Sequence, residues 1–247
     1  MREFVYDFKK NKVLLFFKVF FLVFFSLILI LCFSFGKSTT ASIDSNFSNS
    51  QGKSLYTITD SIVQPDDFQR FRTSNKSIDT VAQFYNGLNK SDKFEFLSVF
   101  NQSIYISDFK GNPDFLEGDT YYNPNNEKKV STVKSIQMNR NSFEFYNLKL
   151  EKGSGIEWNN VDMTTEEKDS IPIVLGNDYS DYYNLGDILH GEFYFKQSNF
   201  TVVGFLEKNS SIFYKENQNY FLDDSILIPY PLELPHTKQN TKEFLGI

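Results

Sequence analysis

The chain has 247 residues and an uneven distribution of charge: residues 1–36 carry +3, the whole chain carries −6, and the remainder therefore carries −9. An acidic remainder of this kind has no electrostatic basis for binding nucleic acid or an anionic membrane surface. The single cysteine, Cys32, excludes an intramolecular disulfide, so the chain after residue 36 must be stabilised by packing alone.

Residues 13–35 form the first predicted element, a transmembrane helix. They are apolar at almost every position and would form a helix of roughly 34 Å, which is long enough to cross a bilayer. The one charged side chain, Lys18, lies near the amino-terminal end, where its aliphatic stem can reach the headgroups. Basic residues outnumber acidic ones before the helix, which predicts a cytoplasmic amino terminus and an extracellular position for everything after Gly36.

A cleaved signal peptide and a lipoprotein signal are the alternatives to an anchor. A signal peptide has an apolar region of roughly 7–15 residues that ends in a small-x-small site, whereas this one is longer and ends Cys32-Phe33-Ser34-Phe35-Gly36, so that cleavage would fall within residues 34–41. Leu31 precedes Cys32, where a lipoprotein signal needs a small residue. The sequence therefore favours an uncleaved single-pass protein of the cell membrane.

The composition divides the chain into four parts and predicts an α+β fold for the last of them. The linker is rich in Ser, Thr and Asn, which is typical of a flexible spacer. The exterior part is large enough to bury its own core, as one domain or two small lobes. The four parts are a basic cytoplasmic tail (1–12), the transmembrane helix (13–35), the linker (36–54) and a mixed exterior domain (55–247).

Alternating and helical periodicities predict the elements of the first half of the exterior domain. The helix at residues 77–88 places apolar side chains on one face, and we expect that face to pack on a sheet. The expected elements are a strand at 55–59, helices from Pro65 and at 77–88, strands at 94–100 and 103–109, an exposed loop at 110–129, a strand at 130–138, a short strand or helix at 143–150 and a loop to 170.

Residues 171–206 form the most patterned block of the chain. We expect a buried strand at 171–175, a short helix at 179–183, and paired strands at 188–195 and 200–206. Turns separate these elements, and we assign the turn residues a role in backbone geometry, not in a catalytic or binding site. The predicted structural turn residues are Gly176 at the end of the first strand, Gly186 in a left-handed conformation, Asp187 bonding the amides of its own turn, and Gly204 at a close backbone approach.

Three short motifs of this block, in their order and spacing, resemble a known family: Val174-Leu175-Gly176, Leu185-Gly186-Asp187 and Val202-Val203-Gly204-Phe205. They are similar to the extracytoplasmic (periplasmic core) domain of MacB-type permeases of the ABC transporter superfamily, whose membrane part is FtsX-like. In that family the first membrane helix precedes this domain, as residues 13–35 do here. Family members continue into three more membrane helices, whereas residues after Pro229 are not apolar enough to span a membrane.

The resemblance implies a component of an ABC transporter permease, in an export or antimicrobial-peptide and bacteriocin-related system. The chain would supply the anchor and the extracytoplasmic coupling domain. Its implied partners are an FtsX-like permease half and a cytoplasmic ATPase subunit, with a peptide or a lipid as substrate. A fragment, a split permease and a free-standing relative all fit the missing helices. The alternative function is a stand-alone membrane-tethered binding or immunity module.

No motif predicts an enzyme, a cofactor site or a metal site. Gly36-Lys37-Ser38-Thr39 lacks the earlier glycine of a phosphate-binding loop, and neither histidine has a partner at metal-ligand spacing. The aspartates at 178, 181 and 187 do not fit a calcium loop, and no serine lies in a nucleophile elbow. Most aromatic residues are expected in the core. The candidates for an exposed apolar ligand groove are Tyr121, Tyr182 and Tyr183.

Overall fold

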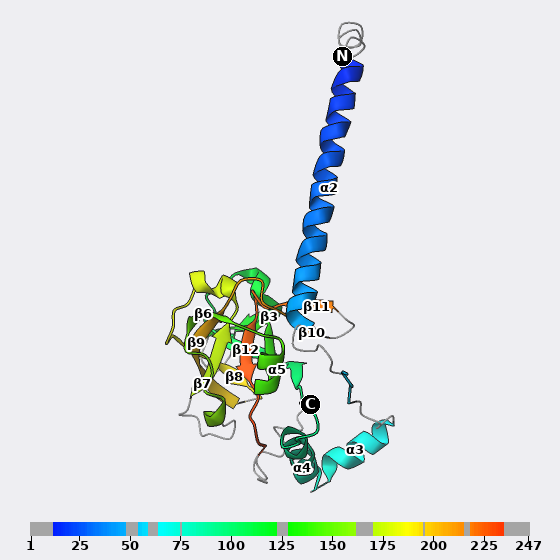
Figure 1. Ribbon diagram of the computed structural model, residues 1–247. Helices are drawn as coiled ribbons and strands as arrows, with labels where there is room; N and C mark the ends of the chain where they lie inside the picture. Colours follow the sequence, from blue (N-terminus) through cyan, green and yellow to red (C-terminus); the bar gives the residue numbers. More distant parts are fainter. Residues whose placement is uncertain are drawn as a thin grey trace. The chain divides into compact units, whose positions relative to one another are not determined.

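The computed structural model describes residues 12–47, 54–58, 64–74, 76–122, 128–161, 170–194, 196–214 and 218–234 (Figure 1). The chain divides into two compact units, Met1–Ser45 and Asn46–Ile247. The first contains one long apolar helix and the second a curled mixed sheet with short helices. This arrangement confirms the predicted α+β class.

The first unit is dominated by α2 (Lys12–Phe47), a helix of 36 residues. Among the described residues, Phe16–Ser34 is the segment long and apolar enough to cross a membrane, and none of it is buried within that part of the chain. The helix continues to Phe47, into residues that the composition assigns to a flexible linker. Continuing a formed helix costs little, since each added residue gains a backbone hydrogen bond, and no proline interrupts these positions.

The second unit is built on a mixed sheet of ten strands in the order β1-β5-β12-β7-β9-β8-β2-β4-β3, with β6 also paired to β9. A separate hairpin joins β10 to β11. The strands are β1 (Val99–Asn101), β2 (Ile104–Ser107), β3 (Leu116–Tyr122), β4 (Lys129–Val133), β5 (Ser135–Met138), β6 (Leu150–Gly153), β7 (Ser170–Leu175), β8 (Ile188–Phe193), β9 (Lys196–Leu206), β10 (Ser211–Tyr214), β11 (Gln218–Phe221) and β12 (Ile226–Pro229).

The centre of the sheet is apolar on both faces. β7 runs parallel to β9, and β12 runs parallel to β5. Leu175 packs in one core cluster with Tyr179 and Phe200, whereas its neighbour Val174 packs in a second cluster with Leu206. Because successive side chains of a strand point to opposite faces, a continuous apolar run is buried on both sides. The predicted buried strand at 171–175 is thus confirmed.

The second unit also contains short helices: α3 (Pro65–Thr73), α4 (Ser77–Asn89), α5 (Arg140–Phe145) and the 3₁₀ turns η2 (Pro113–Phe115), η3 (Trp158–Asn160) and η4 (Asn177–Asp181). The predicted helices from Pro65 and over 77–88 are confirmed. The expected helix at 179–183 is instead η4, which begins and ends two residues earlier.

The packing of α4 differs from the expectation that it covers the sheet. Its buried residues Ala82 and Tyr85 form a small cluster with Leu234. The Tyr85 hydroxyl donates to the Pro231 carbonyl oxygen at 2.8 Å. The chain after β12 therefore takes the place that the sheet was expected to occupy, and Phe84 on the same helix stays exposed.

Three further predictions about strands were wrong. Residues 54–58 form no strand, and only the end of the expected strand at 94–100 joins the sheet, as β1. The expected loop at 110–129 contains η2 and the edge strand β3. Most of β3 is exposed, so it lacks the apolar alternation that marks a half-buried strand.

Candidate functional site

Gly176 lies where two backbones approach closely. A Cβ at this position would lie 2.0 Å from the Leu222 carbonyl oxygen and 2.3 Å from that of Asp223. Its amide donates to the Ser225 carbonyl oxygen at 2.9 Å. Gly176 therefore joins the end of β7 to the turn before β12, and a side chain has no room there.

Gly186 and Asp187 form a turn that is fixed to β9. Gly186 has a φ of +85°, the left-handed conformation expected of it. The Gly186 amide donates to the Val202 carbonyl oxygen at 2.8 Å, and the Val202 amide donates to the Asp187 carbonyl oxygen at 3.0 Å. The Asp187 carboxylate accepts a hydrogen bond from the Asn184 amide at 2.9 Å, within its own turn.

Gly204 lies at a close approach of β6 to β9. A Cβ there would lie 3.2 Å from the Lys152 carbonyl oxygen. Its register partner, Gly153, has a φ of +96°, and a Cβ on it would lie 2.6 Å from the Gly204 Cα. The sequence analysis did not single out Gly153, because a glycine in a segment expected to be a loop gives no sign of a close backbone approach.

The three candidate tyrosines lie in different surroundings, and none of them lines the cavity described below. Tyr183 is 7% exposed, and its hydroxyl accepts a hydrogen bond from the Lys110 amide at 2.9 Å. Its expected exposure was wrong, because the ring belongs to the core cluster around Tyr179. Tyr121 and Tyr182 are exposed, with rings near Tyr105 and Phe115 respectively. A ligand groove at these two residues stays a prediction.

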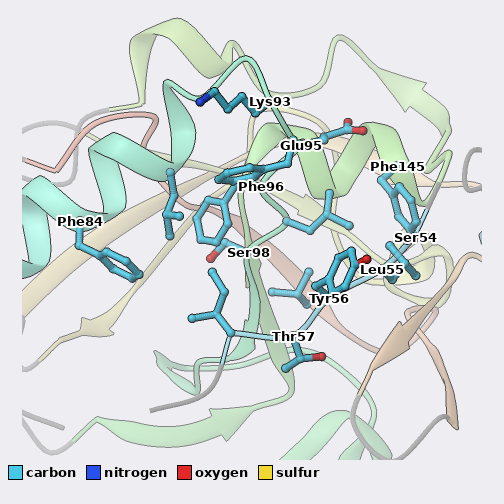
Figure 2. Close-up of a pocket in the computed structure, with 15 residues that line it drawn as sticks. Ser54, Leu55, Tyr56, Thr57, Phe84, Lys93, Glu95, Phe96, Ser98 and Phe145 are labelled. Atoms are coloured by element: carbon cyan, nitrogen blue, oxygen red, sulfur yellow. The ribbon is translucent and has the colours of Figure 1, made fainter. Parts of the chain in front are cut away.

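A cavity of about 1280 Å³ lies elsewhere, between α4, the segment that leads into β1, and residues 54–58. We call it the apolar groove. Figure 2 shows Lys93 and Glu95 along one edge, with Phe84 and Phe145 on opposite sides. The lining consists of Ser54, Leu55, Tyr56, Thr57, Ile58, Phe84, Leu88, Lys93, Phe94, Glu95, Phe96, Leu97, Ser98, Val99 and Phe145.

Large apolar side chains are exposed around this groove. Leu55, Tyr56, Ile58, Phe84 and Phe94 are between 51% and 90% exposed. Single exposed apolar residues are common on protein surfaces, but a contiguous group of them marks a binding surface. The sequence analysis missed this site because it read residues 55–59 and 94–100 as strands. The dense aromatic content of residues 94–100 was the available signal.

Asn139, the residue before α5, fixes the wall of the groove. Its side-chain amide donates to the Phe96 carbonyl oxygen at 2.9 Å, and its side-chain oxygen accepts from the Ser98 amide at 3.2 Å. The backbone amide of Asn139 and the Ser142 hydroxyl both donate to the Ser98 carbonyl oxygen, at 3.1 and 3.0 Å. The backbone of this wall is thus held in place while its apolar side chains face the groove.

The lining of the groove is mainly apolar. Lys93 and Glu95 are the ionisable side chains in its lining, apart from the hydroxyl of Tyr56. Within the residues that the structure describes, no group of three or more His, Cys, Asp or Glu side chains is arranged to hold a metal ion. A pocket with an apolar lining and a few polar groups at its edge is typical of a ligand site.

No protein-family model and no curated protein shows a significant match to the chain. Among solved structures, the chain is similar to the periplasmic region of MacB from Actinobacillus actinomycetemcomitans, with a TM-score of 0.34 and 16% sequence identity. The similarity covers 60% of this chain and 54% of that chain, so the match spans about half of the solved structure. At this TM-score the likeness does not establish a common fold.

Proposed function

We propose that the chain is a membrane-anchored, permease-type component of an ABC transporter in an export or antimicrobial-peptide and bacteriocin-related system. The observation that carries the proposal is the block at residues 171–206, in which the three family-like motifs follow an apolar amino-terminal helix. The chain itself catalyses no reaction in this proposal. Its partners are an FtsX-like permease half and a cytoplasmic ATPase subunit, and its cargo is a peptide or a lipid.

In this proposal α2 anchors the protein and the second unit acts outside the membrane as a coupling domain. The block supports such a role mechanically, because its turns connect strands at the centre of the sheet. Gly176 links β7 to the turn before β12, and Gly186 and Asp187 link the turn before β8 to β9. A domain whose strands and turns are joined by these hydrogen bonds can move as one rigid body when a partner moves it.

Purification of the tagged full-length chain from its native membranes, in a mild detergent, tests this proposal. We expect an ATPase subunit and a hydrophobic permease half to copurify with the chain, and the complex to hydrolyse ATP. The chain purified alone should show no ATP hydrolysis. A tagged single-pass protein of unrelated sequence, from the same membranes, is the control. Recovery of the chain with neither partner would exclude the permease role.

The apolar groove favours a second candidate, a stand-alone membrane-tethered binding or immunity module. Its exposed aromatic residues can bind a ligand without any partner subunit. Sequencing the DNA that follows codon 247 separates the two candidates. A reading frame with three apolar spans and a neighbouring ATPase gene would support the permease. An isolated gene would support the binding module.

A further inference from the structure

We propose that the apolar groove binds an acyl chain of a zwitterionic phospholipid taken from the membrane that α2 spans. The inference rests on the anchoring role of α2 in the proposed function, but not on any transporter partner. It follows from the size of the groove, from the hydrogen bonds of its wall, and from the two charges at its edge.

The size and lining of the groove fit a long apolar ligand. Its volume of about 1280 Å³ is larger than the roughly 300–1,000 Å³ of ordinary ligand pockets. Ten of its fifteen lining residues are aliphatic or aromatic, and five of these are the exposed residues named above. An acyl chain would remove those side chains from water without bringing polar groups into the groove.

The hydrogen bonds of the wall disfavour a peptide as the ligand. An extended peptide must pair its own amides and carbonyls with the protein when it is buried. Along the wall, the Ser98 amide and carbonyl oxygen are already bonded to Asn139 and Ser142. The Phe96 carbonyl oxygen accepts from both Asn139 and Asn141. A hydrocarbon chain needs no such partners, so this wall suits a lipid better.

The edge of the groove carries one charge of each sign, on Lys93 and Glu95 (Figure 2). This pair complements a zwitterionic headgroup, with the ammonium of Lys93 facing the phosphate and the carboxylate of Glu95 facing the amine. The net charge of −9 on the chain after residue 36 disfavours an anionic lipid.

The chain itself connects the groove to a source of phospholipid. Residues 54–58 form part of the lining, and only residues 48–53 separate them from Phe47, the last residue of α2. A fully extended chain advances at most about 3.6 Å per residue, so this connection is short. The apolar part of α2 is the candidate membrane span. Residues 35–53 therefore tether the groove to the bilayer that α2 spans, and the proposed ligand comes from that bilayer.

Fluorescence quenching by phospholipids with brominated acyl chains, in nanodiscs that hold the purified full-length chain, tests the proposal. Trp158 is the single tryptophan, so Trp158→Phe provides a silent background. Phe94→Trp then reports on the groove, and Phe221→Trp on β11 is the control, since the two positions are 51% and 47% exposed. We expect brominated phosphatidylethanolamine to halve the emission of the Phe94→Trp reporter at least and to leave the control reporter unchanged.

A second substitution locates the bound chain. Phe84→Asp places a charge in the groove at an exposed helix position, so the protein should fold, and it should restore the emission of the Phe94→Trp reporter. Equal quenching of both reporters, or no quenching of Phe94→Trp, would overturn the proposal. The proposal would also be overturned if an apolar peptide changed the emission of the Phe94→Trp reporter and the brominated lipid did not. Since no ATPase or permease half is present, these outcomes are independent of whether the chain belongs to a transporter.

Discussion

Gly176 and Gly186 both lie in turns, but different physical causes require glycine at the two positions. At Gly176 a Cβ would meet backbone oxygens at 2.0 and 2.3 Å, which cannot move aside as a flexible side chain could. We expect Gly176→Val to lower the free energy of unfolding by about 3 kcal/mol or more. At Gly186 there is open space, but the φ of +85° disfavours a branched side chain. Gly186→Val should therefore cost only about 1–2 kcal/mol.

Thermal unfolding of the full-length chain in detergent, followed by near-ultraviolet circular dichroism, measures both effects. The matched controls are Gly186→Asn, which tolerates a left-handed conformation and should lose less stability than Gly186→Val, and Gly176→Asn, which should stay strongly destabilised. An unchanged melting temperature for Gly176→Val would contradict the close approach seen here.

Removing the hydroxyl of Tyr179 should stabilise the protein, in contrast to the glycine substitutions. The hydroxyl is fully buried and has no hydrogen-bond partner within the described part of the chain. Burial, followed by the nearby charge of Asp224, raises the pKa of this hydroxyl well above its usual value, so it stays neutral. Its ring packs 4.5 Å from that of Phe115, and a phenylalanine would keep this contact. We expect Tyr179→Phe to stabilise the protein by about 1 kcal/mol.

Tyr183→Phe is the matched control for Tyr179→Phe. It removes a hydroxyl that accepts from the Lys110 amide, so it should destabilise the protein by about 1 kcal/mol. The two variants delete the same atom from neighbouring core residues, and chemical denaturation compares them directly. Equal losses of stability would mean that the Tyr179 hydroxyl has a partner in solution.

At the scale of elements, α4 is held to the chain after β12 by a reciprocal pair of hydrogen bonds. The Asn86 side-chain amide donates to the Leu234 carbonyl oxygen at 3.0 Å, and its side-chain oxygen accepts from the Leu234 amide at 2.8 Å. We expect Asn86→Ala to destabilise this attachment by about 2 kcal/mol, since both bonds are buried. Hydrogen exchange of the Leu234 amide should then accelerate.

The neighbouring Gln83 provides the control for this attachment. It is an exposed residue of the same helix, so Gln83→Ala should leave the exchange of Leu234 unchanged and alter stability by about 0.5 kcal/mol at most. Slow exchange of Leu234 in Asn86→Ala would show that the other contacts of the segment, among them the Tyr85–Pro231 and Asn89–Leu232 hydrogen bonds, hold it without Asn86.

The elements that the sequence predicted well are those whose pattern reflects their own burial. β7 is an apolar run because both faces of the central sheet are covered, and the turn at Gly186 carries its own backbone signal. β3 was missed because an edge strand with mostly exposed residues looks like a loop. The apolar groove was missed for a related reason: its aromatic residues were assigned to a core that the tertiary structure does not form there.

At the scale of the whole molecule, the two units differ in what stabilises them. The second unit buries its apolar residues within itself, whereas Phe16–Ser34 is unburied among the described residues. A helix of this kind is stable in lipid and insoluble in water. The helix therefore fits a membrane-anchored protein, and the function proposed for the folded unit depends on which side of the membrane that unit occupies.

The distribution of basic residues predicts that side, and cysteine labelling in intact cells can measure it. Because positive charge before a span is retained in the cytoplasm, we expect the amino terminus inside and the folded unit outside. In a Cys32→Ser background, which removes the single cysteine, Lys208→Cys on the exposed turn before β10 should react with a membrane-impermeant maleimide. Lys10→Cys should react only after the cells are permeabilised. The reverse labelling pattern would place the folded unit in the cytoplasm and exclude an extracytoplasmic coupling domain, whatever partners the chain binds.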